Sequence, residues 1–164
     1  MRMMLRAFPG ACSGVIFGLA LLLAAAAGGC NRSTTDKDIE TVSVAEVRRL
    51  LMEAETQRKD DLIVLVDPRP VQDFQAAHIP GARNVLLSNL PPGGRVDRGL
   101  SRFDRIVVYG EDPGSATARG MTKRLLGNGY DGVRWMSGGL REWTDLGGEV
   151  AGTAATPLPS TPRG

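Results

Sequence analysis

Short apolar runs alternate with segments of helical periodicity between residues 42 and 150. The apolar runs predict strands at residues 62–66, 82–85, 106–109 and 133–136. The periodic segments predict helices at residues 43–54, 71–77, 116–126 and 140–146. Strands that alternate with helices need right-handed crossovers, which place helices on both faces of a sheet. The pattern therefore predicts an α/β fold with a doubly wound, mainly parallel sheet of about five strands flanked by helices.

Local signals define several of these elements. Ser43 and Glu46 form a capping-box pattern that predicts the start of the first helix. The apolar face of this helix consists of Val47, Leu50, Leu51 and Ala54. The uninterrupted run Leu62–Val66 is typical of a strand covered on both faces, and the Pro-Pro-Gly-Gly stretch within Pro91–Gly99 predicts a long turn.

A turn-rich loop, Gly110 to Ser115, separates the apolar run 106–109 from the following helix. Open α/β sheets place ligands where a buried strand ends and a helix begins. The loop is therefore a candidate site, although its sequence, Gly-Glu-Asp-Pro-Gly-Ser, contains no cysteine.

Three segments, Leu62–Val85, Arg105–Ala118 and Gly127–Val150, resemble in order the three signatures of a rhodanese domain. The resemblance extends over about Val42 to Val150 and depends on several short motifs at matching spacings. These motifs are Asp67-x-Arg69, Asp73-Phe74, the His-Ile-Pro-Gly-Ala run from His78 to Ala82, and Gly138-Gly139 with Trp143.

The resemblance implies a sulfurtransferase fold in which a cysteine directly after the fourth strand carries sulfur as a persulfide. This sequence has Gly110 at that place, and it has Ser115 where many members carry a loop arginine. We therefore predict a degenerate loop with no catalytic residue. The family also places Asp67 and Arg69 close to the loop, either as a structural ion pair or as a pocket rim where Arg69 holds an anion.

The composition of the loop favours a structural role over anion binding. Backbone amides and the helix dipole could still hold an anion weakly. However, Glu111 and Asp112 add like charge that repels an anion by roughly 1 kcal/mol, and Pro113 removes one amide donor. As a structural element, Pro113-Gly114 forms a turn, and Ser115 or Asp112 provides an N-cap.

Other candidate sites are weaker. His78, the single histidine, precedes the strand at 82–85, so we expect it at the amino ends of the strands, more than about 10 Å from Ser115. A serine nucleophile paired with His78 is therefore not predicted. Trp135, Met136 and Trp143 are predicted to pack in the core or at its rim. No metal site and no cofactor are predicted, because Glu111 and Asp112 have no histidine or cysteine nearby.

The amino-terminal segment Met1–Gly29 is typical of a bacterial lipoprotein signal peptide. It begins with Arg2 and Arg6, continues with an apolar stretch shorter than the roughly 20 residues that span a membrane, and ends in small residues before Cys30. Processing would attach lipid to the sulfur of Cys30 and remove Cys12, the other of the two cysteines. The mature chain would then have no free thiol and would be anchored to a bacterial membrane in the cell envelope.

The remaining segments are predicted to be flexible. Residues 30–41 are predicted to form a polar tether with a reach on the order of 15 to 20 Å. The domain is predicted to occupy residues 42–150, and residues 151–164 are predicted to form a disordered Pro/Thr-rich tail. Without Arg2 and Arg6, 18 basic residues face 18 acidic ones. A near-neutral chain without a basic stripe argues against nucleic-acid binding.

Three functions are compatible with the sequence. The favoured one is a membrane-tethered, catalytically inactive module that binds an envelope protein or a small anion. A second is an active sulfurtransferase that uses an unmodified Cys30 or the cysteine of a partner. A third is a purely structural assembly domain.

Overall fold

The computed structural model describes residues 34–94 and 98–153 of the 164-residue chain. Its elements in chain order are η1 (Asp36–Asp38), β1 (Thr41–Val42), α1 (Val44–Gln57), β2 (Ile63–Asp67), α2 (Val71–Ala76), β3 (Arg83–Asn84), η2 (Leu87–Asn89), α3 (Arg98–Ser101), β4 (Arg105–Tyr109), α4 (Ala116–Gly127), β5 (Val133–Met136) and α5 (Gly139–Asp145). Strands and helices alternate through most of the chain, as the hydrophobic pattern predicts.

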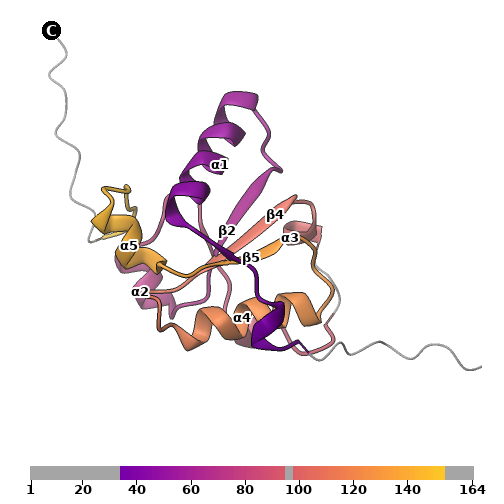
Figure 1. Ribbon diagram of the computed structural model, residues 1–164. Helices are drawn as coiled ribbons and strands as arrows, with labels where there is room; N and C mark the ends of the chain where they lie inside the picture. Colours follow the sequence, from indigo (N-terminus) through magenta and orange to yellow (C-terminus); the bar gives the residue numbers. More distant parts are fainter. Residues whose placement is uncertain (1–33, 95–97, 154–164) are drawn as a thin grey trace, which may run out of the picture. The chain divides into compact units, whose positions relative to one another are not determined.

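The five strands form one sheet in the order β1-β5-β4-β2-β3, and every neighbouring pair is parallel. Because side chains alternate along a strand, Leu65 and Val107 face the core on the α1 side, whereas Val66 and Val108 face the core on the α4 side. Figure 1 shows α1 and α4 on opposite sides of the strands. The predicted α/β class, with a parallel sheet covered by helices, is confirmed.

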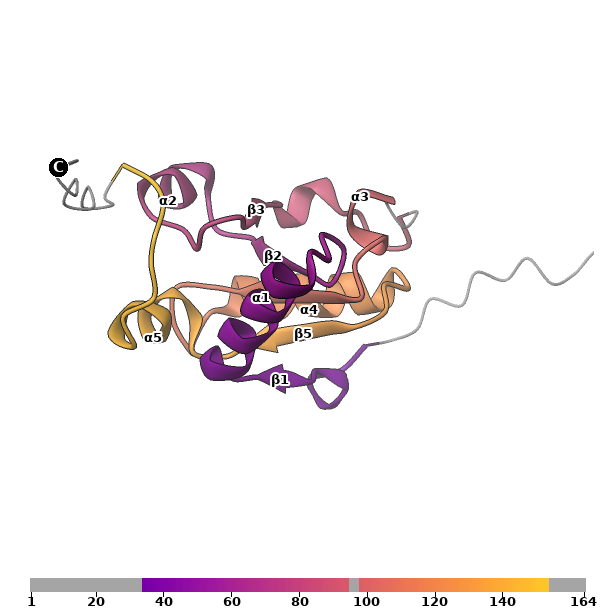
Figure 2. The same ribbon diagram turned by 90° about the horizontal axis from the view of Figure 1, so that it is seen from above.

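Parallel strands give the domain two distinct ends. We call the end where the strands begin the amino pole and the end where they finish the carboxyl pole. The loop Gly110–Ser115 follows β4 and therefore lies at the carboxyl pole. Figure 2 shows α2 and α5 at this end of the domain and α3 at the other.

Helix α1 begins where the sequence predicts. The Ser43 hydroxyl accepts a hydrogen bond from the Glu46 amide at 3.2 Å and caps the helix, while Val44, Val47 and Leu50 are buried. The helix ends at Arg58, which adopts a left-handed conformation with φ of 53°. A C-terminal residue of this kind stops a helix and turns the chain back toward the sheet.

The predicted tether is wrong over much of its length. Residues 36–38 form η1, and Asp36 pairs with Lys123 of α4 at 2.7 Å. Thr41 and Val42 then pair with β5 as an edge strand. Two residues alone give no periodicity, so this strand depends on a long-range partner that sequence patterns do not show.

Two further boundaries differ from the prediction. The predicted tail begins too early, because Ala151 exchanges two backbone hydrogen bonds with His78, each 2.8 Å, and the Thr153 amide donates to Gln75. The predicted long turn also ends too late, since Arg98 and Gly99 belong to α3. None of the helices among the described residues is both long and apolar enough to span a membrane.

Candidate functional site

The loop Gly110–Ser115 is fixed by the start of α5. The Gly110 carbonyl accepts a hydrogen bond from the Leu140 amide at 2.8 Å, and the Glu111 carbonyl accepts one from Arg141 at 2.9 Å. This contact requires a glycine at position 139, where φ is 66° and a Cβ would lie 2.8 Å from the backbone of Glu111. The Gly138-Gly139 motif thus brings α5 against the loop.

Several donors of the loop are used within it. The Gly114 amide donates to the Asp112 carboxylate at 2.8 Å, and the Ser115 amide donates to the Asp112 carbonyl at 3.1 Å. The Ser115 hydroxyl caps α4 by accepting from the Ala118 amide at 3.3 Å. Pro113 has no amide hydrogen. These contacts match the predicted turn and N-cap, and they occupy donors that an anion would otherwise use.

The side chain of Ser115 fills the space beside Gly110. A Cβ built on Gly110 would lie 2.2 Å from the Ser115 hydroxyl oxygen and 2.4 Å from the Ser115 Cβ. A rotation of the hydroxyl relieves the first contact but leaves the second unchanged. Position 110 therefore accepts no side chain while Ser115 keeps its place.

Asp67 and Arg69 form a buried ion pair behind the loop. The Asp67 carboxylate accepts from Arg69 Nη2 at 2.7 Å and from Nε at 3.0 Å, and the Arg69 backbone amide also donates to it. Arg69 Nη1 donates to the Glu111 carboxylate at 2.5 Å, and Nη2 donates to the Ala77 carbonyl. Each of the three guanidinium nitrogens thus has a partner inside the domain, as a structural ion pair requires.

The electrostatics of this cluster follow from burial and from its two carboxylates. Burial lowers the pKa of Arg69, but hydrogen bonds and charge from Asp67, and then from Glu111, outweigh it and leave that pKa above its ordinary value. Burial, followed by the negative charge of Asp67, raises the pKa of the Tyr109 phenol far above its usual range. Arg69 therefore stays charged and Tyr109 stays protonated at neutral pH.

Tyr109 connects β4 to the segment before β3. The Ile79 amide donates to the Tyr109 hydroxyl at 3.1 Å, and both residues are fully buried. The sequence pattern identifies Tyr109 only as the end of an apolar strand. A single hydroxyl at the end of a buried strand is the signal that would have marked it as a hydrogen-bonding residue.

We expect Tyr109→Phe to lower the free energy of unfolding by about 1–3 kcal/mol, because the buried Ile79 amide loses its acceptor. Urea denaturation followed by tryptophan fluorescence measures the change. An unaltered free energy of unfolding would contradict the role assigned to this hydroxyl.

His78 does not lie at the amino ends of the strands, so that part of the prediction is wrong. Its neighbour Ile79 contacts the last residue of β4, and β3 pairs only with the final residues of β2. The segment therefore crosses the carboxyl pole. His78 still has a structural role, since Nδ1 lies 2.7 Å from the Phe74 carbonyl and its ring stacks on Phe74 at 3.9 Å, whereas Ser115 is bonded to α4.

The tryptophans and Met136 pack as predicted. Met136 and Trp143 belong to the core on the α1 side, and the Trp143 indole donates to the Glu149 carbonyl at 2.7 Å. Trp135 packs against the core on the α4 side with the Arg119 guanidinium over its ring. In the described part of the chain, no group of three or more His, Cys, Asp or Glu side chains is arranged to hold a metal ion. The candidate lipidation residue, Cys30, lies outside the described residues.

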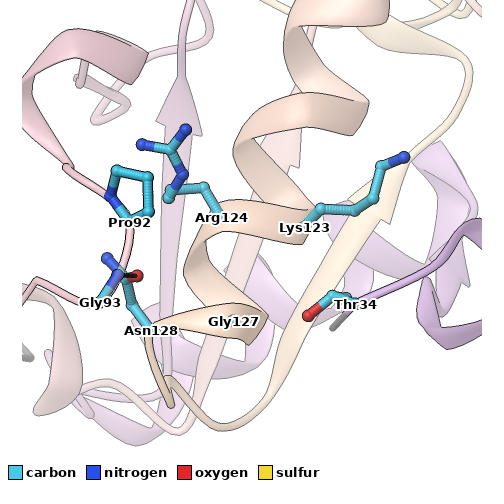
Figure 3. Close-up of a pocket in the computed structure, with 7 residues that line it drawn as sticks. All are labelled: Thr34, Pro92, Gly93, Lys123, Arg124, Gly127 and Asn128. Carbon is cyan, nitrogen blue, oxygen red and sulfur yellow. Dashed lines mark hydrogen bonds between the residues drawn. The ribbon is translucent and has the colours of Figure 1, made fainter. Parts of the chain in front are cut away.

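Some hollows of the described surface lie away from the loop. One of about 500 Å³ lies between α1 and α5 and includes Met52 and Trp143. Two others, of about 170 and 370 Å³, lie at the amino pole and share Thr34. Figure 3 shows the smaller one, with Lys123 and Arg124 projecting from α4 beside it.

Comparisons with known proteins agree on a family. The sequence model described as "Rhodanese-like domain" matches residues 43–146. The chain is 33% identical over 90 residues to the adenylyltransferase and sulfurtransferase UBA4 of Candida albicans. That match covers 50% of this chain but only 19% of UBA4, so the chain corresponds to about a fifth of that relative.

Solved structures show the same fold. The rhodanese-like domain of the Anabaena protein Alr3790 superposes with a TM-score of 0.51 at 20% identity, covering 76% of this chain and 87% of that one. The human single-domain sulfurtransferase TSTD1 gives a TM-score of 0.50 at 25% identity, covering 64% of this chain and 95% of that one.

Proposed function

The chain belongs to the rhodanese-like domain family, and on that premise we propose that it is a lipid-anchored, catalytically inactive member that acts as a binding or regulatory module in the cell envelope. The observation that carries the proposal is the state of the loop after β4. It contains no cysteine, and the Ser115 side chain takes the space that a side chain at position 110 would need.

The contacts around the loop favour a protein partner over a small anion. Arg69 is 8% exposed and already paired with Asp67 and Glu111, and the amides of Gly114 and Ser115 donate within the loop. An incoming anion would have to displace a carboxylate from Arg69 and would meet the charge of Asp112. Gln72, Glu111 and Glu142 at the carboxyl pole are, in contrast, exposed to a partner.

A thiosulfate-to-cyanide assay tests the absence of catalysis. We expect the purified, processed protein to give no turnover above buffer, because sulfur transfer needs a thiolate that this loop lacks. A Cys30→Ser variant is the control. Turnover that is sensitive to thiol alkylation and disappears in this variant would contradict the proposal.

An active sulfurtransferase is the second candidate. The similarity of the chain to UBA4 and TSTD1, which are both described as sulfurtransferases, favours it. In that case sulfur would be carried by an unmodified Cys30 or by the cysteine of a partner bound at the loop. Activity that requires a second protein and survives Cys30→Ser would support the partner version.

Metabolic labelling tests the anchor. We expect a fatty-acid analogue to label the protein expressed with its own signal segment, and Cys30→Ser to abolish the label, because lipoprotein processing attaches lipid to this sulfur. Cys12→Ser is the matched control and should leave labelling intact. A protein that is unlabelled and not bound to membranes would contradict anchoring.

A further inference from the structure

The described chain begins at the amino pole. Thr34 lies beside Lys123 and Asn128 at the end of α4, and it also borders the hollow next to Gly132 at the start of β5. Figure 3 shows Thr34 beside the last turn of α4. The first described residue therefore lies at the pole opposite the loop Gly110–Ser115.

The residues after Thr34 are bound to the domain rather than free to extend. The Thr35 amide and hydroxyl both donate to the Asp38 carboxylate, at 2.7 and 2.8 Å. Asp36 pairs with Lys123, and the Glu40 carbonyl accepts from the Trp135 amide at 2.9 Å. The pKa of Asp36 is lowered by its hydrogen bond with Lys123 and then by the charge of that lysine. The Asp36–Lys123 pair attaches η1 to α4, and the Glu40 contact attaches the residue before β1 to β5.

The length of chain that can separate Cys30 from the domain is consequently small. Four residue steps lead from Cys30 to Thr34, and even a fully extended chain covers at most about 14 Å over that length. A folded domain of this size is about 35 Å across. A lipid on Cys30 would thus hold the amino pole near the bilayer, and the tether is too short to bring the carboxyl pole there.

The two poles differ in charge, and the difference favours an orientation with the amino pole toward the bilayer. At the carboxyl pole, residues 67–76, 110–115 and 139–145 contain six acidic and two basic side chains. At the amino pole, residues 34–38, 58–61, 98–105 and 123–132 contain eight basic and six acidic ones. An anionic phospholipid surface attracts lysine and arginine and repels the acidic pole.

We propose that the amino pole, around Thr34, Lys123, Arg124 and Asn128, is the surface that faces the phospholipid headgroups, and that the acidic carboxyl pole with the loop points away from the membrane. This inference rests on the proposed lipid anchor at Cys30. The loop, α2 and α5 are then the part of the domain that an envelope partner meets.

Energy transfer to labelled lipid measures the orientation. The full-length protein, processed and purified with its lipid, is reconstituted in vesicles of phosphatidylethanolamine and phosphatidylglycerol that carry a headgroup acceptor dye. Two separate variants each carry one cysteine for a donor dye at an exposed position. Asp131→Cys places it at the amino pole, and Gln72→Cys places it at the carboxyl pole. Because the Cys30 sulfur carries lipid, the introduced cysteine is the thiol that reacts with the dye.

We expect transfer from position 131 to exceed transfer from position 72 by roughly twofold, since the labels lie at opposite ends of a domain about 35 Å across. Inserting a long Gly-Ser linker after Asn31 should reduce this difference, because the tether then no longer sets the orientation. Equal transfer from both positions in the native-length protein would overturn the inference while leaving the anchor intact. A protein without lipid that does not bind the vesicles would overturn the proposed anchor itself.

Discussion

Replacing Gly110 by alanine is expected to lower the free energy of unfolding by about 1–3 kcal/mol, although alanine adds only one methyl group. The added Cβ would lie 2.4 Å from the Ser115 Cβ, so the start of α4 or the end of β4 must move. Because both of the shortest contacts are with Ser115, Ser115→Gly should relieve most of the clash and leave a tight contact with the Ala118 Cβ at 3.1 Å. Ser115→Gly alone should cost only a few tenths of a kcal/mol as a change of N-cap.

The double-mutant cycle is the measurement. The free energies of unfolding of wild type, G110A, S115G and the double variant should show a coupling of about 1–3 kcal/mol in favour of the double variant. Gly120→Ala is the matched control: its nearest neighbour is a Leu87 methyl group at 3.9 Å, and alanine favours a helix, so it should be neutral or stabilising. Additive costs in G110A and S115G would contradict the packing described.

The same geometry applies to a cysteine at position 110. We expect Gly110→Cys alone to remain inactive, because its Cβ meets Ser115 in the same way. In the combination with Ser115→Gly the two contacts below 3 Å are removed, and the Ala118 Cβ at 3.1 Å is the tight contact that remains among those given. A reactive thiol at this position would thus need both a cysteine at position 110 and a smaller residue at position 115.

Removing the Asp67 carboxylate is expected to have the largest effect on stability. Asp67→Ala leaves the Arg69 cation buried with only the Glu111 carboxylate to neutralise it, and breaking a buried ion pair costs about 3–5 kcal/mol. Glu111→Gln is the control, since Glu111 is 55% exposed and such a pair contributes about 0–1 kcal/mol. Urea denaturation of the two variants compares these costs directly.

A third variant keeps this prediction testable if Asp67→Ala fails to fold. The pair Asp67→Leu with Arg69→Met removes both charges together and should be less destabilising than Asp67→Ala. If Asp67→Ala is as stable as wild type, or if the double variant is less stable than Asp67→Ala, the role assigned to the buried ion pair is contradicted.

The sequence predicts the elements well where packing repeats along the chain. The strands at 62–66, 106–109 and 133–136 lie within one residue of those observed, since a parallel sheet buries uninterrupted apolar runs. The helix starts at Ser43 and Ser115 follow from local capping chemistry that needs no distant partner.

The sequence fails where a contact depends on distant partners. Thr41 and Val42 become a strand only through β5, and η1 is held by Lys123, so a polar segment that resembles a tether belongs to the domain. The predicted place of His78 is wrong because β3 is short and pairs with the end of β2 rather than along its length. The sequence likewise does not show that Ser115 fills the space beside Gly110.

Mass spectrometry of the processed protein after incubation with thiosulfate shows whether this chain takes up sulfur. We expect the mass of the mature chain, with the proposed lipid on Cys30, to stay unchanged, since no thiol is left to take up sulfur. A mass increase of one sulfur atom that reducing agents reverse would show a persulfide on this chain and would contradict the proposed absence of catalysis.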